Sequence, residues 1–289
     1  MRKALLAGLI GLAVISGGII LWNSAPVEFW RLERQKANLP AAEPFDTTNA
    51  TNSGESTNGA NPTNINEPPE PVINTNEAPV VTNTNTAPPV TEIATEKNLA
   101  VPFTSQAPHA NWDLDHNEFC EEASVLMVGR YFQGRGISGP DDAEEALQKI
   151  KQWEIDNLGF YYDTTAAETA KILEGLYELK VQLVKNPIVE NINQAIANGK
   201  LVIVPAAGRE LGNPNFTAPG PIYHNLVIRG YTKDGKFITN DPGTRKGQEY
   251  VYRQATVMNA MHDWVPKDPR TTARNGSSTG TPVILVVSK

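Results

Sequence analysis

The sequence predicts an α+β fold in which a helical half precedes a mostly antiparallel sheet. Helix start signals, among them an acidic first turn and a capping box, occupy residues 120–177. Runs rich in β-branched residues, separated by turn signals, follow residue 201. The composition also changes sharply near residue 98, so we expect residues 98–289 to form one domain behind an apolar segment and a polar linker.

The apolar segment at the start is long enough to cross a membrane. Residues 1–3 form a short basic head, and residues 4–22 carry no charge, which matches a helix across a bilayer core of about 30 Å. We therefore expect one transmembrane anchor over residues 1–25. A cleavable signal peptide is the alternative, but the apolar run is longer than its usual hydrophobic region and Asn23-Ser24-Ala25 is a poor cleavage site.

Residues 26–97 are expected to be a juxtamembrane segment followed by a disordered linker. From about residue 37 the chain consists mainly of Asn, Thr, Pro, Glu and Ala, and it cannot bury enough apolar surface to offset its conformational entropy. A polar spacer between a membrane anchor and a domain is typical of a stalk. We therefore expect residues 98–289 on the extracytoplasmic side of the cell membrane, or secreted if the anchor is cleaved.

Three helices are expected in the first half of the domain. The first covers residues 120–132, and the second begins with an acidic turn at Asp141, where carboxylates suit the positive end of the helix dipole. A capping box at Thr165 opens the third, which continues to about residue 177. Together these segments make the helical half of the predicted fold.

The second half is expected to be mainly strands. A short helix over residues 189–198 ends at Gly199, the residue type favoured just after a helix. Asp234-Gly235 is a strong hairpin signal between two β-rich runs. The expected strands cover residues 181–184, 201–205, 225–231, 237–242, 249–252 and 283–287.

Cys120 is the only cysteine of the sequence. A lone thiol forms no internal disulfide and no multi-cysteine zinc site, so it is either a buried apolar residue or a reactive group. Its place at a helix start favours a reactive thiolate, and an exported protein seldom keeps an unused free thiol. The acidic neighbours Glu121 and Glu122 discourage ionisation, so a histidine has to supply more of the activation.

His224 has the best setting for that histidine. It lies at the start of a strand after a loop rich in glycine and proline, where an imidazole is held firmly and still reaches a cleft. The paired strand ends in Asn240-Asp241, and either residue is a candidate to orient the ring. A two-residue hairpin loop places Asp241 on the face of His224, whereas a three-residue loop favours Asn240. A flat hairpin leaves a gap of about 13 Å along the strands, which twist, a bulge or another turn must close.

Four separated motifs of the domain resemble those of papain-like cysteine peptidases. More closely, they resemble the family 39-like group, which is related to the peptidases that remove double-glycine leaders from bacteriocins. The resemblance covers nearly all of residues 98–289. The motifs are Val101-Pro102-Phe103-Thr104-Ser105-Gln106-Ala107-Pro108 with Asn111-Trp112, then Cys120-Glu121-Glu122-Ala123-Ser124, the His224 strand ending in Gly230-Tyr231, and Asn240-Asp241-Pro242-Gly243.

The resemblance implies a cysteine peptidase that hydrolyses peptide bonds. It assigns Cys120 as the nucleophile, His224 as the general base and acid, and Asp241 as the group that orients the imidazole. It also assigns the Gln106 amide, with the backbone N–H of Cys120, to the oxyanion hole. The implied partner is a peptide or protein, with cell-wall peptides among the candidates, and neither a metal nor an organic cofactor is required. A net charge of −7 gives no sign of a nucleic-acid partner.

One alternative function belongs to another class. A catalytically inactive surface module with a papain-like groove would bind peptides or cell-wall polymers instead of cutting them. The substrate, the cleavage specificity and the oligomeric state do not follow from the sequence. The reactivity of the Cys120 thiol distinguishes the enzyme from the binding module.

Overall fold

A computed structural model describes residues 33–46, 93–267 and 275–289 of the chain. The described residues up to Phe45 and from Ala94 to Lys289 belong to one compact unit, and a second unit, Asp46–Ile93, lies almost wholly outside the described residues. The predicted anchor, residues 1–25, also lies outside them. Within the described part of the chain, no helix combines the length and the apolar character that a membrane crossing needs.

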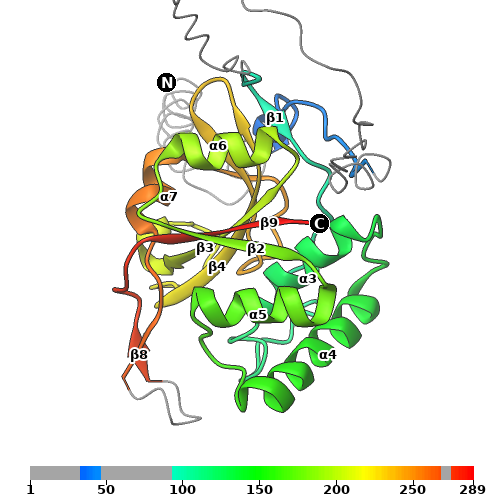
Figure 1. Ribbon diagram of the computed structural model, residues 1–289, viewed down its shortest axis with the longest axis vertical. Coiled ribbons are helices and arrows are strands. Elements are labelled where there is room, and N and C mark those ends of the chain that lie inside the picture. Colours follow the sequence, from blue (N-terminus) through cyan, green and yellow to red (C-terminus); the bar gives the residue numbers. More distant parts are fainter. Residues whose placement is uncertain (1–32, 47–92, 268–274) are drawn as a thin grey trace, which may run out of the picture. The chain divides into compact units, whose positions relative to one another are not determined.

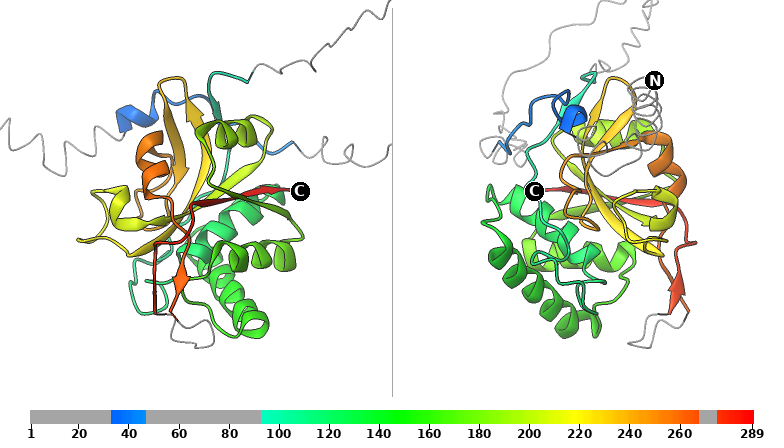
Figure 2. Two further views of the ribbon diagram at one scale, coloured as in Figure 1. Left: turned by 60° about the vertical axis from the view of Figure 1, so that its left-hand side comes forward. Right: turned by 180° about the vertical axis from the view of Figure 1, so that it is seen from behind.

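Three helices form one side of the domain, as the sequence predicts. They are α3 (Cys120–Phe132), α4 (Pro140–Leu158) and α5 (Ala166–Tyr177), and they lie together in all views of Figures 1 and 2. The capping box at Thr165 is confirmed, because its hydroxyl accepts from the Glu168 N–H while the Glu168 carboxylate accepts from the Thr165 N–H.

The other half of the domain is a sheet in which every strand pairing is antiparallel. The described residues form seven strands of this sheet in the order β2-β9-β3-β4-β5-β6, with β1 paired to β4. The predicted α+β architecture is therefore confirmed. The strands are β1 (Lys97–Asn98), β2 (Lys180–Lys185), β3 (Leu201–Ala207), β4 (Tyr223–Thr232), β5 (Lys236–Asn240), β6 (Tyr250–Arg253) and β9 (Val283–Ser288).

The core lies between the sheet and the helices. Helix α3 packs on β4, and α6 (Val189–Ala197) packs on β3 and β4. Every residue of α3 and of β3 is buried, so both elements are covered on all sides. This burial explains why β3 is a continuous apolar run rather than an alternating one. It also fixes the start of α3, where Cys120 lies, against the strand that begins with Tyr223 and His224.

Several short elements of the structure are not among those predicted from the sequence. These include η2 (Gly208–Leu211), α7 (Gln254–Ala260), and the separate pair β7 (Val265–Pro266) and β8 (Gly276–Ser277). Strand β1 begins one residue before the predicted domain boundary. In addition, Glu43 exchanges backbone hydrogen bonds with residues 98–100, and the Phe45 ring packs edge-on against Phe132. These described ends of the predicted linker therefore lie on the domain surface.

Candidate active site

The hairpin formed by β4 and β5 has a three-residue loop, and its first strand contains a bulge. Thr232 pairs with Lys236, so residues 233–235 form a three-residue loop. The pairing register then shifts between Ile228 and Gly230, which leaves one extra residue in β4. A bulge of this kind changes which residues of the two strands share a face.

The bulge brings His224 and Asp241 together. A three-residue loop alone would have placed Asn240 on the sheet face of His224. The extra residue in β4 places Asp241 on that face instead, and it shortens the separation from His224 along the strands from about four residues to about two. His224 Nε2 lies 2.8 Å from Asp241 Oδ1. Asn240 instead donates its amide to the backbone carbonyls of residues 101–102. Of the two candidates, Asp241 is the residue that contacts the imidazole.

Contacts with the start of the domain hold the bulge in place. The extra residue is Arg229, whose guanidinium donates to Asn98 Oδ1 at 3.0 Å and to the Val101 carbonyl at 3.3 Å. The next residue, Gly230, lies so close to β1 that a Cβ there would be 2.4 Å from the Lys97 carbonyl oxygen. Only glycine fits at this position, which explains the Gly230-Tyr231 motif.

The Asp241 carboxylate is fully buried and accepts four hydrogen bonds. Oδ1 accepts from His224 Nε2 at 2.8 Å and from the Gly243 N–H at 3.0 Å. Oδ2 accepts from Tyr252 Oη at 2.6 Å and from Asn213 Nδ2 at 3.0 Å. Burial alone would raise the pKa of Asp241, but the adjacent His224 charge and these hydrogen bonds outweigh it and lower the pKa. Asp241 therefore stays ionised and accepts a hydrogen bond from the His224 Nε2–H group. This keeps the proton on Nε2 and leaves Nδ1 as the ring nitrogen that can accept a proton.

Asn213 and Tyr252 are site residues that no sequence motif indicates. Asn213 lies in the loop after η2, and Tyr252 lies on β6. Each is only one polar residue among many in the sequence, and neither belongs to a recognisable motif. The Phe216 ring adds an edge-on contact with the His224 imidazole at 5.2 Å between centroids. These three residues orient the buried His224–Asp241 pair without standing near it in the chain.

Cys120 lies at the first turn of α3 and is 6% exposed. Its thiol donates to Glu121 Oε2 at 2.8 Å. Burial, and then the Glu121 charge, raise the pKa of the thiol, whereas the backbone N–H of Asn225 lowers it. Because Asn225 directly follows His224, the sulfur lies beside the strand that carries the imidazole.

Three carboxyl groups in or next to the first turn of α3 are buried. Glu121, Glu122 and Glu154 are each 0–1% exposed, and within the described residues none of them forms an ion pair. Burial raises the pKa of each one, and repulsion between neighbouring carboxylates raises it further. Both effects favour the protonated form of these carboxyl groups. Of the three, Glu121 and Glu122 raise the pKa of the Cys120 thiol, as the sequence predicts.

Gln106 lies in the same cleft as Cys120. Its backbone N–H donates to the Pro242 carbonyl at 2.9 Å, which ties it to the turn after β5. Its side-chain Nε2 donates to the carbonyls of His116 at 2.8 Å and Asn117 at 3.2 Å. The amide group is therefore held beside the start of α3, with its two donors directed at carbonyl oxygens.

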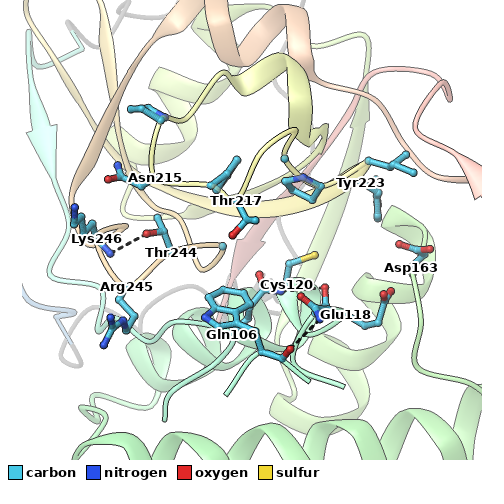
Figure 3. A pocket seen from close by; sticks show the side chains of 18 of the residues that line it. Gln106, Glu118, Cys120, Asp163, Asn215, Thr217, Tyr223, Thr244, Arg245 and Lys246 are labelled. Atoms are coloured by element: carbon cyan, nitrogen blue, oxygen red, sulfur yellow. Dashed lines mark hydrogen bonds between the residues drawn. The ribbon is translucent and has the colours of Figure 1, made fainter. Parts of the chain in front are cut away.

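A cleft of about 920 Å³ opens above Cys120 (Figure 3). Its volume lies at the upper end of the roughly 300–1,000 Å³ typical of ligand sites, which suits an extended chain. His224 and Asp241 do not line it but lie buried beneath its wall. One wall comes from the segment before α3, and the other from residues 214–223 and the turn after β5. Among the lining residues are Gln106, Trp112, Cys120, Phe216, Tyr223 and Thr244.

Replacing Gly243 with alanine is expected to displace the imidazole. A Cβ at this position would lie 2.9 Å from His224 Cε1 and 2.8 Å from a Phe216 ring carbon, closer than real contacts allow. For the peptidase activity that the sequence predicts, we expect Gly243→Ala to reduce kcat/KM at least about tenfold, because a small misplacement of the imidazole would be costly. Steady-state kinetics on a peptide substrate measures this. Gly136→Ala, where a Cβ meets nothing within 4 Å, is the matched control and should leave kcat/KM unchanged. Equal activity of the two variants would contradict the expectation.

Comparison with known proteins shows the family to which the chain belongs. The chain matches the model of the Peptidase_C39 like family over residues 98–266. Among solved structures, it is similar to a crystal structure of a protein assigned as a C39-like peptidase from Bacillus anthracis, with 17% identity and a TM-score of 0.39 over 68% of this chain and 97% of that chain. No protein with a curated description matches. Because the family match covers more than half of the chain, this protein belongs to the Peptidase_C39 like family.

Proposed function

We propose that the chain is a cysteine peptidase that hydrolyses peptide bonds through Cys120, His224 and Asp241. One observation carries the proposal. A buried His224–Asp241 pair, joined at 2.8 Å, lies beneath a cleft that is lined by the single cysteine of the sequence. The family match supports the same class of chemistry.

The arrangement suits a reaction in two halves. Because Asp241 holds Nε2 of the ring, Nδ1 takes the thiol proton as the Cys120 sulfur attacks the peptide carbonyl carbon. His224 then gives that proton to the leaving amine, and a thioester forms at Cys120. In the second half, His224 deprotonates a water that attacks the thioester, which releases the carboxylic acid and returns the proton to the thiol. Each step balances with water as the only co-reactant.

Gln106 is proposed to stabilise the oxyanion with the backbone N–H of Cys120. A donor aimed at the developing charge contributes about 2.7–4 kcal/mol in comparable sites. In the free protein the Gln106 amide bonds to the carbonyls of His116 and Asn117, so it has to release one of them when the oxyanion forms. Its position in the cleft lining beside Cys120 supports the role.

Peptide cleavage by the full chain tests the proposal. A mixture of peptides with blocked termini is incubated with the protein, and new termini are identified by mass spectrometry. We expect new termini with the wild type and none above background with Cys120→Ala. If both proteins give the same termini, Cys120 is not the nucleophile. If neither cleaves any peptide bond, the peptidase proposal fails.

Glu121→Gln is expected to make the thiol more acidic. The Glu121 carboxylate accepts a hydrogen bond from the thiol at 2.8 Å and raises the pKa of Cys120, so its removal should lower that pKa. The pH at which alkylation by iodoacetamide becomes fast should therefore fall, by about one unit for a tenfold gain in thiolate. Alkylation rates across pH measure it. The matched control is Glu145→Gln, an exposed carboxylate on α4. An unchanged pH profile in Glu121→Gln would show that this carboxylate does not control the thiol.

A second candidate function is a catalytically inactive module that binds peptides or cell-wall polymers in the same cleft. The observation that favours it is the state of Cys120, whose thiol is almost fully buried, donates to a carboxylate and has a raised pKa. Such a thiol is inert unless His224 activates it. The two functions therefore differ in one measurable property, the dependence of thiol reactivity on His224.

We also propose that residues 1–25 anchor the chain in the cell membrane, that residues 26–97 tether the domain, and that residues 98–289 act on the extracytoplasmic side. The uncharged run over residues 4–22 and the polar composition that follows support this arrangement. Membrane fractionation of the full chain, with the mature N-terminus sequenced, tests it. A membrane-bound chain that retains residues 1–25 supports the anchor. A mature chain that begins after residue 25 supports secretion instead.

A further inference from the structure

We propose that the cleft selects peptides that carry opposite charges on the two sides of the bond to be cut. An acidic side chain would lie over Arg245 and Lys246, and a basic side chain would lie over Glu118 and Asp163. The inference rests on the proposed function, because it takes Cys120 to mark the position of that bond. It names the charge pattern of the substrate, which the peptidase chemistry alone does not specify.

The basic end of the cleft comes from the turn after β5. Arg245 and Lys246 line the cleft, and both are exposed. Neither forms an ion pair with any of the described residues. The turn itself is well held, because the Lys246 N–H donates to Thr244 Oγ1 and the Gly247 N–H donates to the Thr244 carbonyl. Two unpaired cations are thus presented on a fixed backbone.

The acidic end lies on the other side of Cys120. Figure 3 shows Glu118 and Asp163 on one side of the sulfur and Arg245 and Lys246 on the opposite side. Asp163 comes from the loop between α4 and α5, and Glu118 comes from the segment before α3. The two ends of the cleft are therefore built from different parts of the fold.

Glu118 lacks a compensating cation. Burial raises the pKa of Glu118, and no lysine, arginine or histidine of the described residues forms an ion pair with it. Asp163 adds a second negative charge at this end of the cleft, and that charge raises the pKa of the buried Glu121. A basic substrate side chain at this end would supply Glu118 with a positive charge.

Opposite charges at the two ends discriminate between peptides by repulsion as well as attraction. A peptide with acidic groups at both ends meets one favourable and one unfavourable end, and so does a peptide with basic groups at both ends. Only a peptide with one group of each sign, in the correct direction, satisfies both. Because the charged groups are partly exposed, the effect should weaken as salt shortens the screening length from about 30 Å at 0.01 M to about 8 Å at 0.15 M.

Binding to the full-chain Cys120→Ala protein in a nonionic detergent tests the inference without requiring cleavage. Four fluorescent peptides share a neutral centre and carry two Asp or two Lys at each end, which gives Asp–Lys, Lys–Asp, Asp–Asp and Lys–Lys. Fluorescence anisotropy at low salt gives each Kd. We expect one of the two mixed peptides to bind at least about tenfold more tightly than the other three, and this preference to shrink at 0.15 M salt. Equal affinities of all four peptides would overturn the inference.

A charge-reversal variant assigns the preference to the cleft. With Arg245→Glu and Lys246→Glu added, both ends become acidic, so the Lys–Lys peptide should become the tightest binder. The control pair Lys171→Glu and Lys233→Glu makes the same change in net charge at exposed positions outside the cleft. It should retain the wild-type preference, and loss of the preference in this control would also overturn the inference. Alkylation of Cys120 by neutral iodoacetamide reports separately on the proposed catalysis.

Discussion

Replacing Cys120 with serine is expected to abolish peptide hydrolysis while the fold is retained. A buried hydroxyl at this position can donate to the Glu121 carboxylate as the thiol does, so little stability should be lost. The hydroxyl is a much weaker nucleophile, and loss of a nucleophile that acts as a unit with its base typically costs about 10³-fold or more. We expect kcat/KM to fall by at least that factor. Peptide cleavage rates and thermal unfolding measure the two effects.

Ser124→Ala is the matched control on the same helix. Ser124 is fully buried one turn after the cysteine, and its hydroxyl donates to the Cys120 carbonyl at 2.8 Å. Its removal should lower stability by about 1 kcal/mol without removing the nucleophile. A Cys120→Ser protein that keeps more than about a tenth of the wild-type kcat/KM would contradict the assigned role, because no loss of nucleophilic catalysis is that small.

Asp241→Asn is expected to be the second most damaging change. All four groups that contact the Asp241 carboxylate act as donors, namely those of His224, Gly243, Asn213 and Tyr252. An asparagine Nδ2 in either orientation would face donors and leave buried groups unsatisfied, at about 1–3 kcal/mol each. If it faces His224, the imidazole loses the partner that holds the Nε2 proton. We therefore expect kcat/KM to fall by about 10²–10⁴-fold, the range for a misplaced catalytic tautomer.

The effect of Asp241→Asn is separable into chemistry and stability. Urea unfolding gives the change in the free energy of unfolding, and kinetics on the folded fraction gives the change in kcat/KM. Asp234→Asn removes the same charge at the opposite end of β5, where the carboxylate is half exposed and pairs with Lys236. It should leave both quantities nearly unchanged. Wild-type activity in Asp241→Asn would show that His224 is oriented in another way.

Local sequence signals predicted the elements that carry Cys120. The helix start at residue 120 and the capping box at Thr165 both depend on residues within one turn, and both agree with the structure. The β-rich run at residues 201–205 likewise predicts a strand, which the structure shows as β3. These features could be predicted because the residues that determine them lie within a few positions of each other.

The geometry around His224 could be predicted only in part, because the residues that determine it lie far apart in the chain. The sequence showed that a twist, a bulge or a different turn was needed, but not which. The bulge at Arg229 is held by Asn98 and Val101, which are more than a hundred residues away. Asn213 and Tyr252 likewise meet at Asp241 only after the loop and the sheet have formed. No spacing rule links such residues.

The peptidase role of Cys120 is tested most directly by its alkylation kinetics in the wild type and in His224→Ala. Iodoacetamide is neutral and small, and mass spectrometry identifies the single cysteine as the modified residue. If His224 takes the thiol proton, the wild type is modified stoichiometrically, and its rate at pH 7 exceeds that of His224→Ala by at least about tenfold. Equal rates in the two proteins, both no faster than free cysteine, would contradict the catalytic role and leave the peptide-binding module as the function of this domain.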